Sequence, residues 1–105
     1  MEKFENVTLE KESNVYFDGK VTSRTFYLEN NERKTLGILM PGEYEFGTDA
    51  AEIMEITKGD VEILKLESND WESYKSGEEF HVPANSSFKI RVKEITDYCC
   101  SYLEV

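Results

Sequence analysis

The sequence predicts an all-β domain, built as a small sandwich or barrel. Over most of the chain, short runs of β-branched and aromatic residues alternate with glycine, aspartate, asparagine and serine, which favour turns. In one of these runs Phe88, Ile90 and Val92 alternate with basic residues, the period-2 pattern of a strand with one buried face. No stretch keeps a 3.6-residue period long enough for a substantial helix. Closely spaced strands in one small domain favour a sandwich or a barrel.

Length and composition bound the domain organisation. The chain has 105 residues, of which 39% are apolar and 12% aromatic, enough to pack one core but not two. We therefore expect a single folded domain over residues 14–105. Residues 1–13 are charged and lack a clear period, so we expect them to form an N-terminal extension or arm.

The expected strands follow one another with short connections. In chain order they fall within residues 15–28, 34–47, 51–66, 71–82, 86–95 and 97–105. Asp18-Gly19 predicts a hairpin, and Lys58-Gly59-Asp60 and Ser76-Gly77-Glu78 mark further turns. Several of the runs are therefore expected to contain two strands joined by a turn.

The charge balance limits the partners. There are 22 acidic and 12 basic side chains, a formal net charge of −10, and the resulting field repels nucleic acids. The chain has no apolar leader and no apolar run of membrane length, which predicts a cytoplasmic protein without a membrane partner. Cys99 and Cys100 are adjacent in the sequence and cannot frame a fold with a disulfide, so we expect buried strand residues.

Two stretches combine glycines, a carboxylate and aromatic residues at fixed spacings. The first comprises Phe46-Gly47-Thr48, Glu52 and Gly59, and the second comprises Gly77, Pro83, Asn85 and Phe88. These spacings resemble the two signature motifs of the cupin superfamily, which are small jelly-roll β-barrels. The resemblance implies a cupin-type jelly-roll barrel. Asn85 stands where a glycine is usual, and asparagine also tolerates a left-handed backbone.

The same motifs supply the metal ligands in metal-binding cupins, namely two histidines and a glutamate from the first and a histidine from the second. On that register Phe46 and Thr48 replace two ligands, Phe88 replaces the last, and only Glu52 remains. A transition metal ion needs three or four converging nitrogen, sulfur or oxygen ligands. We therefore expect no metal site, which disfavours a metal-dependent cupin oxygenase or isomerase.

A closer resemblance covers residues 14–103. The matching positions are Tyr16-Phe17, Gly19-Lys20-Val21, Arg33, Gly37, Gly42-Glu43-Tyr44, Phe46, Thr48, Glu52-Ile53-Met54, Gly59, Trp71, Tyr74, Gly77, Phe80, Val82-Pro83, Phe88 and Tyr102-Leu103. These positions resemble the pyrimidine/purine nucleoside phosphorylase family of small cupins. The resemblance implies a pentosyltransferase of broad specificity. It would convert purine and pyrimidine nucleosides plus inorganic phosphate to free base and pentose 1-phosphate, with no cofactor.

That reaction passes through a transition state with positive charge on the sugar and negative charge on the departing base. Tyr44, Phe46 and Thr48 share one strand parity, and we expect them to line a substrate site in the barrel interior beside Glu52. Phe88 is expected to join them from the opposite sheet. Aromatic rings suit bases of both classes, because every base has a π face.

Glu52 is the expected catalytic residue, with its role left open. A carboxylate there accepts hydrogen bonds from ribose hydroxyls or stabilises the developing charge on the sugar. Burial beside aromatic rings raises its pKa, which also allows proton donation to the base.

Arg33 and Lys20 are the expected phosphate-binding residues. Both match family positions, and the planar guanidinium of Arg33 suits phosphate oxygens. The chain departs from the family pattern in three ways. Residues before position 14 are expected to be extra, His81 stands where asparagine is expected, and Ser101 stands where arginine is expected.

The same residues also have structural explanations. The aromatic side chains can be ordinary barrel filling, Glu52 a surface strand residue, and Arg33 and Lys20 solvated charges. The alternative function is therefore a non-enzymatic small-ligand-binding or sensor cupin, which keeps an aromatic pocket and needs no phosphate site. Cupins commonly pair through their sheets, so the resemblance also implies a homodimer, to which an N-terminal arm can contribute.

Overall fold

The structure is a computed structural model that describes residues 2–103 of the chain. Its strands are β1 (Thr8–Leu9), β2 (Asn14–Tyr16), β3 (Val21–Tyr27), β4 (Arg33–Leu39), β5 (Gly42–Thr48), β6 (Ala51–Lys58), β7 (Asp60–Lys65), β8 (Glu72–Lys75), β9 (Glu78–Val82), β10 (Ser86–Val92) and β11 (Thr96–Leu103). A single 3₁₀ turn, η1 (Phe17–Gly19), is the only helical element among the described residues. The predicted all-β class is confirmed.

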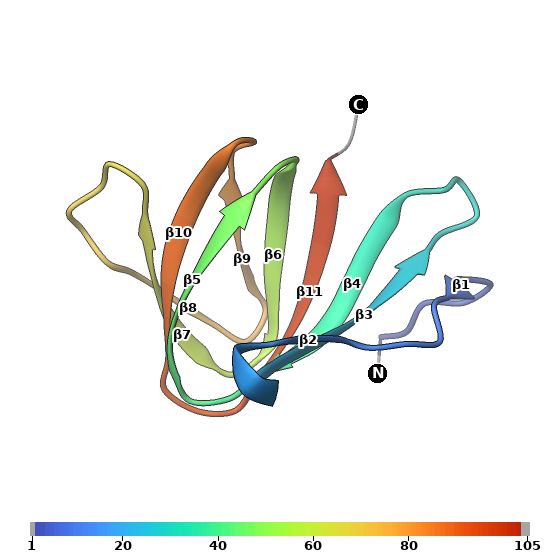
Figure 1. Cartoon of the computed structure of the whole chain (residues 1–105), viewed down its shortest axis with the longest axis horizontal. Coiled ribbons are helices and arrows are strands. Elements are labelled where there is room, and N and C mark those ends of the chain that lie inside the picture. Colours follow the sequence, from blue (N-terminus) through green and yellow to red (C-terminus); the bar gives the residue numbers. More distant parts are fainter. Residues whose placement is uncertain (1, 104–105) are drawn as a thin grey trace.

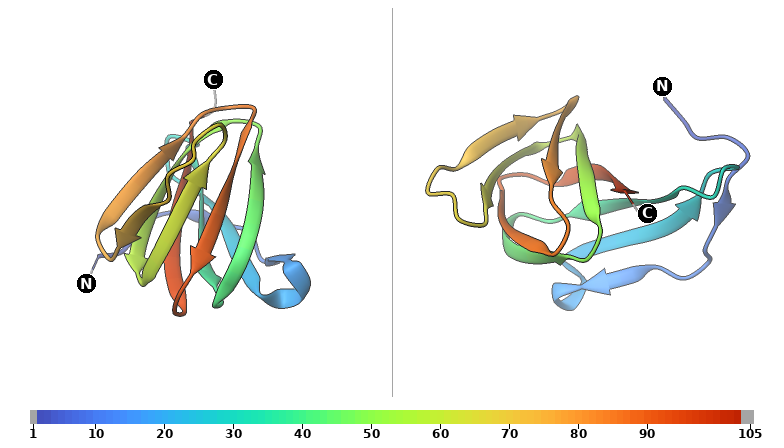
Figure 2. Two further views of the ribbon diagram at one scale, coloured as in Figure 1. Left: turned by 90° about the vertical axis from the view of Figure 1, so that its left-hand side faces the viewer. Right: turned by 90° about the horizontal axis from the view of Figure 1, so that it is seen from above.

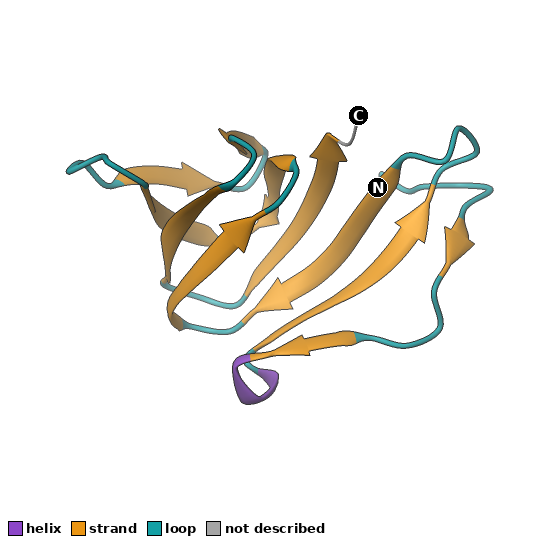
Figure 3. Ribbon diagram, turned by 45° about the horizontal axis from the view of Figure 1, so that its top comes forward, coloured by secondary structure: helices purple, strands orange, loops and turns teal. Residues whose placement is uncertain are grey.

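The strands form two antiparallel sheets that face each other as a half-open barrel (Figures 1 and 2). The larger sheet has the order β1-β3-β4-β11-β6-β9, with β2 also paired to β3, and the smaller has the order β5-β10-β7-β8. β8 and β9 approach each other and close one side of the barrel. On the other side β3 and β4 extend beyond the small sheet (Figure 3), but their inward-facing side chains Ser23, Thr25 and Thr35 are buried.

The turns follow the sequence signals. The hairpin between β2 and β3 places Asp18 at φ 55° and Gly19 at φ 90°, as the Asp-Gly pair predicts. Phe17, which carried no turn signal, also adopts a positive φ of 51°. Asn85 has φ 53°, which confirms the left-handed backbone expected where the family pattern usually has glycine.

The core lies between the two sheets, where alternate residues of each strand point inward. Its largest fully buried side chains are Leu39, Ile56, Ile63, Ile90, Val21, Val61, Val82 and Thr96. On β10, Phe88, Ile90 and Val92 are buried and the intervening basic residues are exposed, which confirms the predicted alternation.

The N-terminal residues lie against the edge and the outer face of the large sheet. β1 pairs with β3 through Thr8–Tyr27 and Leu9–Phe26, and the Phe4 ring packs 4.9 Å from the Phe26 ring. Because part of this segment is a strand of the sheet, it is more closely joined to the domain than a free arm. Among residues 2–103 there is no helix with the length and apolarity needed to cross a membrane.

Candidate functional site

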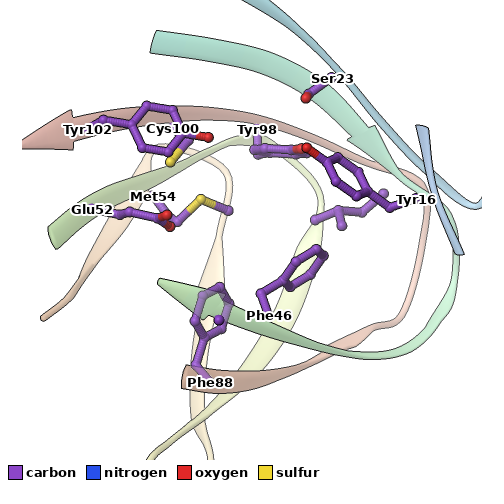
Figure 4. A pocket seen from close by; sticks show the side chains of 11 residues that line it. Tyr16, Ser23, Phe46, Glu52, Met54, Phe88, Tyr98, Cys100 and Tyr102 are labelled. Carbon is purple, nitrogen blue, oxygen red and sulfur yellow. The ribbon is translucent and has the colours of Figure 1, made fainter. Parts of the chain in front are cut away.

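A pocket of about 160 Å³ opens between the sheets (Figure 4). It is lined by Tyr16, Ser23, Leu39, Phe46, Gly47, Glu52, Met54, Phe88, Tyr98, Cys100 and Tyr102. The large sheet supplies most of these residues, and the small sheet contributes the two phenylalanines and Gly47. One wall is therefore mixed polar and sulfur-containing, and the facing wall is aromatic.

The polar wall is a row of side chains across adjacent strands. Glu52 of β6 lies opposite Tyr102 of β11 in the sheet register. On the far side of Tyr102, the guanidinium carbon of Arg33 sits 3.8 Å from the centre of the phenol ring. This stacking places a cation over an electron-rich ring, an attractive arrangement, at the β4 end of the row.

Glu52 is half-buried, and its surroundings act on the pKa of its carboxyl in opposite directions. Burial has the largest effect, and it raises the pKa of the carboxyl above its ordinary value. A hydrogen bond from Cys100 and the positive charge of Arg33 both act to lower the same pKa. The direction expected from the sequence, a raised pKa, agrees with the net effect, and Arg33 is close enough to act on Glu52 electrostatically.

The aromatic wall is built on β5 and β10. Phe46 lies opposite Phe88 in the strand register, and the two ring centres are 5.7 Å apart. The expectation that Phe88 joins from the opposite sheet is wrong, because β10 is the direct neighbour of β5 in the small sheet. Phe17 from the η1 turn packs edge-on against Phe46 at 5.5 Å and supports this wall from the barrel mouth.

Two residues expected in the site face the barrel interior but lie outside the pocket lining. Tyr44 is buried, and its hydroxyl donates to the carbonyl of Met40 at 2.7 Å. The Thr48 hydroxyl donates to the Pro83 carbonyl at 2.7 Å and accepts the Ser86 N–H at 2.9 Å. The shared parity was correctly predicted, but both hydroxyls hold turns together.

The two expected phosphate residues differ in their positions. Arg33 borders the pocket through Tyr102, as described above. Lys20 is exposed at the end of the η1 turn and does not belong to the pocket lining. Ser101 accepts a hydrogen bond from Lys34 on the outer face of the large sheet, so the residue standing at the expected arginine position points away from the pocket wall.

Several lining residues escaped the sequence reasoning. Tyr98, Cys100 and Tyr102 occupy alternate positions of β11 and point toward the same interior, a parity signal already present in the sequence. Tyr16 reaches the pocket from β2, and Ser23 from β3. Nothing in the local sequence of these two residues predicts a pocket, because their approach depends on how the edge of the large sheet curves (Figure 4).

Potential metal ligands do not gather anywhere in the described part of the chain. Within residues 2–103 there is no group of three or more His, Cys, Asp or Glu side chains able to hold a metal ion. His81, the only histidine in the sequence, is exposed on β9 and outside the pocket. The pocket lining combines an aromatic wall with a carboxylate, a thiol and hydroxyl groups.

This architecture defines the class of protein. A cupin-2 domain protein from Shewanella frigidimarina superposes with a TM-score of 0.64 at 18% identity, over 75% of this chain and 76% of that chain. At that identity the likeness concerns the fold alone. The predicted cupin fold is confirmed.

The family follows from closer matches. The model of the pyrimidine/purine nucleoside phosphorylase family matches residues 11–102, and the chain belongs to this family. Proteins named pyrimidine/purine nucleoside phosphorylase from Hydrogenovibrio crunogenus and Sulfurovum sp. are each 58% identical to it, over 99% and 98% of this chain and 100% of each relative. A crystal structure of a protein of unknown function from Acinetobacter sp. ADP1 superposes with a TM-score of 0.93 at 39% identity, covering 95% of this chain and 97% of that one.

The same alignments correct one expectation about the N-terminal segment. The alignment with the Hydrogenovibrio relative spans 99% of this chain and the whole of that relative. The residues before position 14 therefore have counterparts in it, and the expectation that they are extra is wrong. Within this segment Thr8 and Leu9 pair with β3 and so extend the sheet.

Proposed function

We propose that the protein is a metal-independent nucleoside phosphorylase of broad specificity. It converts purine and pyrimidine nucleosides plus inorganic phosphate to free base and pentose 1-phosphate, as a pentosyltransferase. The observation that carries this proposal is the half-buried Glu52 facing an aromatic wall, with Arg33 close enough to act on its charge. Family membership supports the same reaction class.

The pocket suits part of a nucleoside. Its volume of about 160 Å³ is smaller than the roughly 300–1,000 Å³ typical of sites that enclose a drug-sized ligand. We place the base against Phe46 and the exposed ring of Tyr16, where stacking tolerates both base classes. The sugar then lies against Glu52, with the remainder of the substrate toward the open side of the barrel.

We propose Arg33 as the residue that binds phosphate. The inner face of β4 carries its guanidinium over the Tyr102 ring, beside the sugar end of the pocket at Glu52. In a protein with a net charge of −10, an anionic co-substrate needs a local cation. Lys20, which is exposed and lies outside the pocket lining, is the proposed outer phosphate contact.

The reaction can be tested directly. Purified protein, pretreated with a chelator, is incubated with a panel of purine and pyrimidine nucleosides with and without inorganic phosphate, and the products are separated by chromatography. Base release that needs phosphate but no metal supports the proposal. Binding without turnover favours a non-enzymatic small-ligand-binding or sensor cupin. Activity lost to the chelator and restored by a transition metal contradicts metal independence.

The catalytic role of Glu52 can be tested with a single substitution. Glu52→Gln keeps the shape of the side chain and removes the charge, so we expect kcat to fall about 100-fold or more with the fold preserved. The matched control is Glu55→Gln on the same strand, whose side chain lies on the outer face along the groove of Phe26 and Cys99. Near-normal turnover in Glu52→Gln removes this residue from the catalytic set.

We also propose that the chain forms a homodimer in the cytoplasm. Support for pairing comes from the outer face of the large sheet, where Phe4, Leu9 and Leu36 are exposed around a groove floored by Phe26 and Cys99. Light scattering coupled to size-exclusion chromatography measures the mass in solution. A single chain mass at micromolar concentration contradicts the dimer.

A further inference from the structure

Four polar side chains, Thr35, Tyr102, Cys100 and Glu52, follow one another as a chain across adjacent strands of the large sheet, and the last three line the pocket (Figure 4). The Thr35 hydroxyl lies 3.4 Å from the Tyr102 hydroxyl. The Cys100 thiol lines the same pocket beside Tyr102, two residues along β11, and beside Glu52 of the paired strand, within hydrogen-bonding reach of both side chains. The four residues come from β4, β11 and β6, which are adjacent strands of the large sheet.

The number of donors fixes the direction of this chain. An ionised carboxylate only accepts hydrogen bonds, so Cys100 must donate its single S–H to Glu52. The sulfur then serves as acceptor for the O–H of Tyr102, whose oxygen is left to accept the hydroxyl of Thr35. All three protons therefore point toward Glu52 when it is charged. A protonated Glu52 that donates toward Cys100 requires the whole chain to reverse.

Burial makes this arrangement hard to replace with water. Thr35 and Cys100 are only 3% and 2% exposed. In a low-dielectric interior, linked hydrogen bonds strengthen one another, and an unpaired member is costly. The Arg33 guanidinium over the Tyr102 ring adds to the effect, because a cation at the ring draws electron density from the phenol and strengthens its O–H as a donor.

We propose that Cys100 is a positioning residue, whose thiol, backed by Tyr102 and Thr35, holds Glu52 as an anion toward the sugar. Resting on the proposed function, this assigns Glu52 to sugar hydroxyls and the developing positive charge rather than to protonation of the base. Hydrogen bonds to a charged group favour the charged form, and they act here against the desolvation of the carboxylate. Preorganised charge of this kind stabilises the transition state more than the ground state.

The effect of Cys100 on the pKa of Glu52 can be separated from the effects of the charged groups nearby. The titratable and charged groups of the packed elements around the pocket are Arg33 of β4, Tyr98, Cys100 and Tyr102 of β11, and Tyr16 of β2. The facing small sheet contributes Phe46, Gly47 and Phe88 to the pocket lining, and on the same inner face Lys65 of β7 lies opposite Phe88 and pairs with Glu72 at 3.9 Å. Replacing Cys100 thus removes one neutral donor and leaves the charge of Arg33 in place.

The first test does not depend on activity. Carbon-13 NMR of the glutamate side-chain carboxyl follows the titration of Glu52, assigned with Glu52→Gln, in the free protein. We expect the pKa of Glu52 to rise in Cys100→Ala, to return toward the wild-type value in Cys100→Ser, and to rise by a smaller amount in Tyr102→Phe. Cys99→Ala is the matched control, because that neighbouring thiol faces the groove on the outer side of the sheet.

The second test uses phosphorolysis. Loss of a hydrogen bond to a charged group corresponds to about a 10- to 100-fold change, so we expect kcat to fall by at least about tenfold in Cys100→Ala, with KM within about twofold. The acid limb of the pH profile of kcat/KM should move to higher pH, and serine should rescue both effects. Thermal unfolding of each variant checks that the fold persists.

Three results overturn the inference. If the pKa of Glu52 is unchanged in Cys100→Ala, or if Cys99→Ala shifts it equally, the chain does not act on Glu52. If the pKa shifts but kcat is unaffected, Cys100 has no positioning role in the reaction. A wild-type protein without phosphorolysis refutes the proposed function and the catalytic part of the inference, while the NMR titration still decides whether the hydrogen-bond chain exists.

Discussion

Replacing Gly37 with alanine should disrupt the fold at the wall of the pocket. Gly37 lies on β4 directly opposite Tyr98 of β11, and the Tyr98 ring crosses over it toward β3. A Cβ at this position would lie 2.1 Å from the Thr22 carbonyl oxygen and 2.7 Å from the Cζ and hydroxyl of Tyr98, where ordinary contact is 3.4–4 Å. Glycine is therefore required here by close packing across the strand.

The expected cost follows from these distances. The Thr22 oxygen belongs to the backbone of a paired strand, so it must move by more than an ångström in a closely packed sheet. Overpacking typically costs about 1–3 kcal/mol, and a clash with both backbone and ring belongs at or above the upper end. For a domain of this size roughly 3 kcal/mol corresponds to a fall in Tm of about 10–20 °C.

Thermal and urea unfolding of Gly37→Ala measure this cost. The matched control is Gly47→Ala on β5, where the nearest atom to an added Cβ is the Ser86 carbonyl oxygen at an ordinary 3.9 Å. We expect the control to stay within about 1 kcal/mol of the wild type. If Gly37→Ala unfolds within a few degrees of Gly47→Ala, Tyr98 does not lie over Gly37 in the way described.

Three further outcomes follow from the site and its surroundings. Burial raises the pKa of both cysteine thiols, so the native protein should react with iodoacetamide at pH 8 far more slowly than the unfolded chain, and rapid native alkylation seen by mass spectrometry contradicts their burial. Thr48→Val removes hydrogen bonds to Pro83 and Ser86 and should lower the free energy of unfolding by about 1–3 kcal/mol in urea titrations, with kcat per folded molecule unchanged; a large loss of kcat without loss of stability returns Thr48 to the substrate site. Because the folded pKa of Glu52 is raised above 4.5, the native state binds more protons than the unfolded state between pH 4.5 and the folded pKa. The free energy of unfolding therefore falls as pH rises through this interval. Glu52→Gln should therefore have a higher Tm than the wild type at pH 7 and a Tm close to the wild type below pH 4, and the reverse order refutes the desolvation argument.

The features of the site that depend on local sequence patterns could be predicted. The alternation around Ile90 and the turn at Asp18-Gly19 are local patterns, and local sterics and one-sided burial decide them. The alternation of inward and outward residues along a strand also correctly predicted that Phe46 faces the barrel interior. It did not show that the neighbouring inward hydroxyl of Thr48 is used by the Pro83 turn, because that turn is distant in the sequence.

The sequence by itself determined the β class, the turns and, through its many matching positions, the family. The tertiary structure alone decided which side chains meet. Strand pairing sets Glu52 beside Tyr102 and places Phe88 next to Phe46 in the same sheet. Register between strands far apart in the chain depends on the packing of the whole barrel, and no local pattern encodes it. For that reason the sequence could single out Glu52, while the position of Cys100 beside it became visible only in the folded sheet.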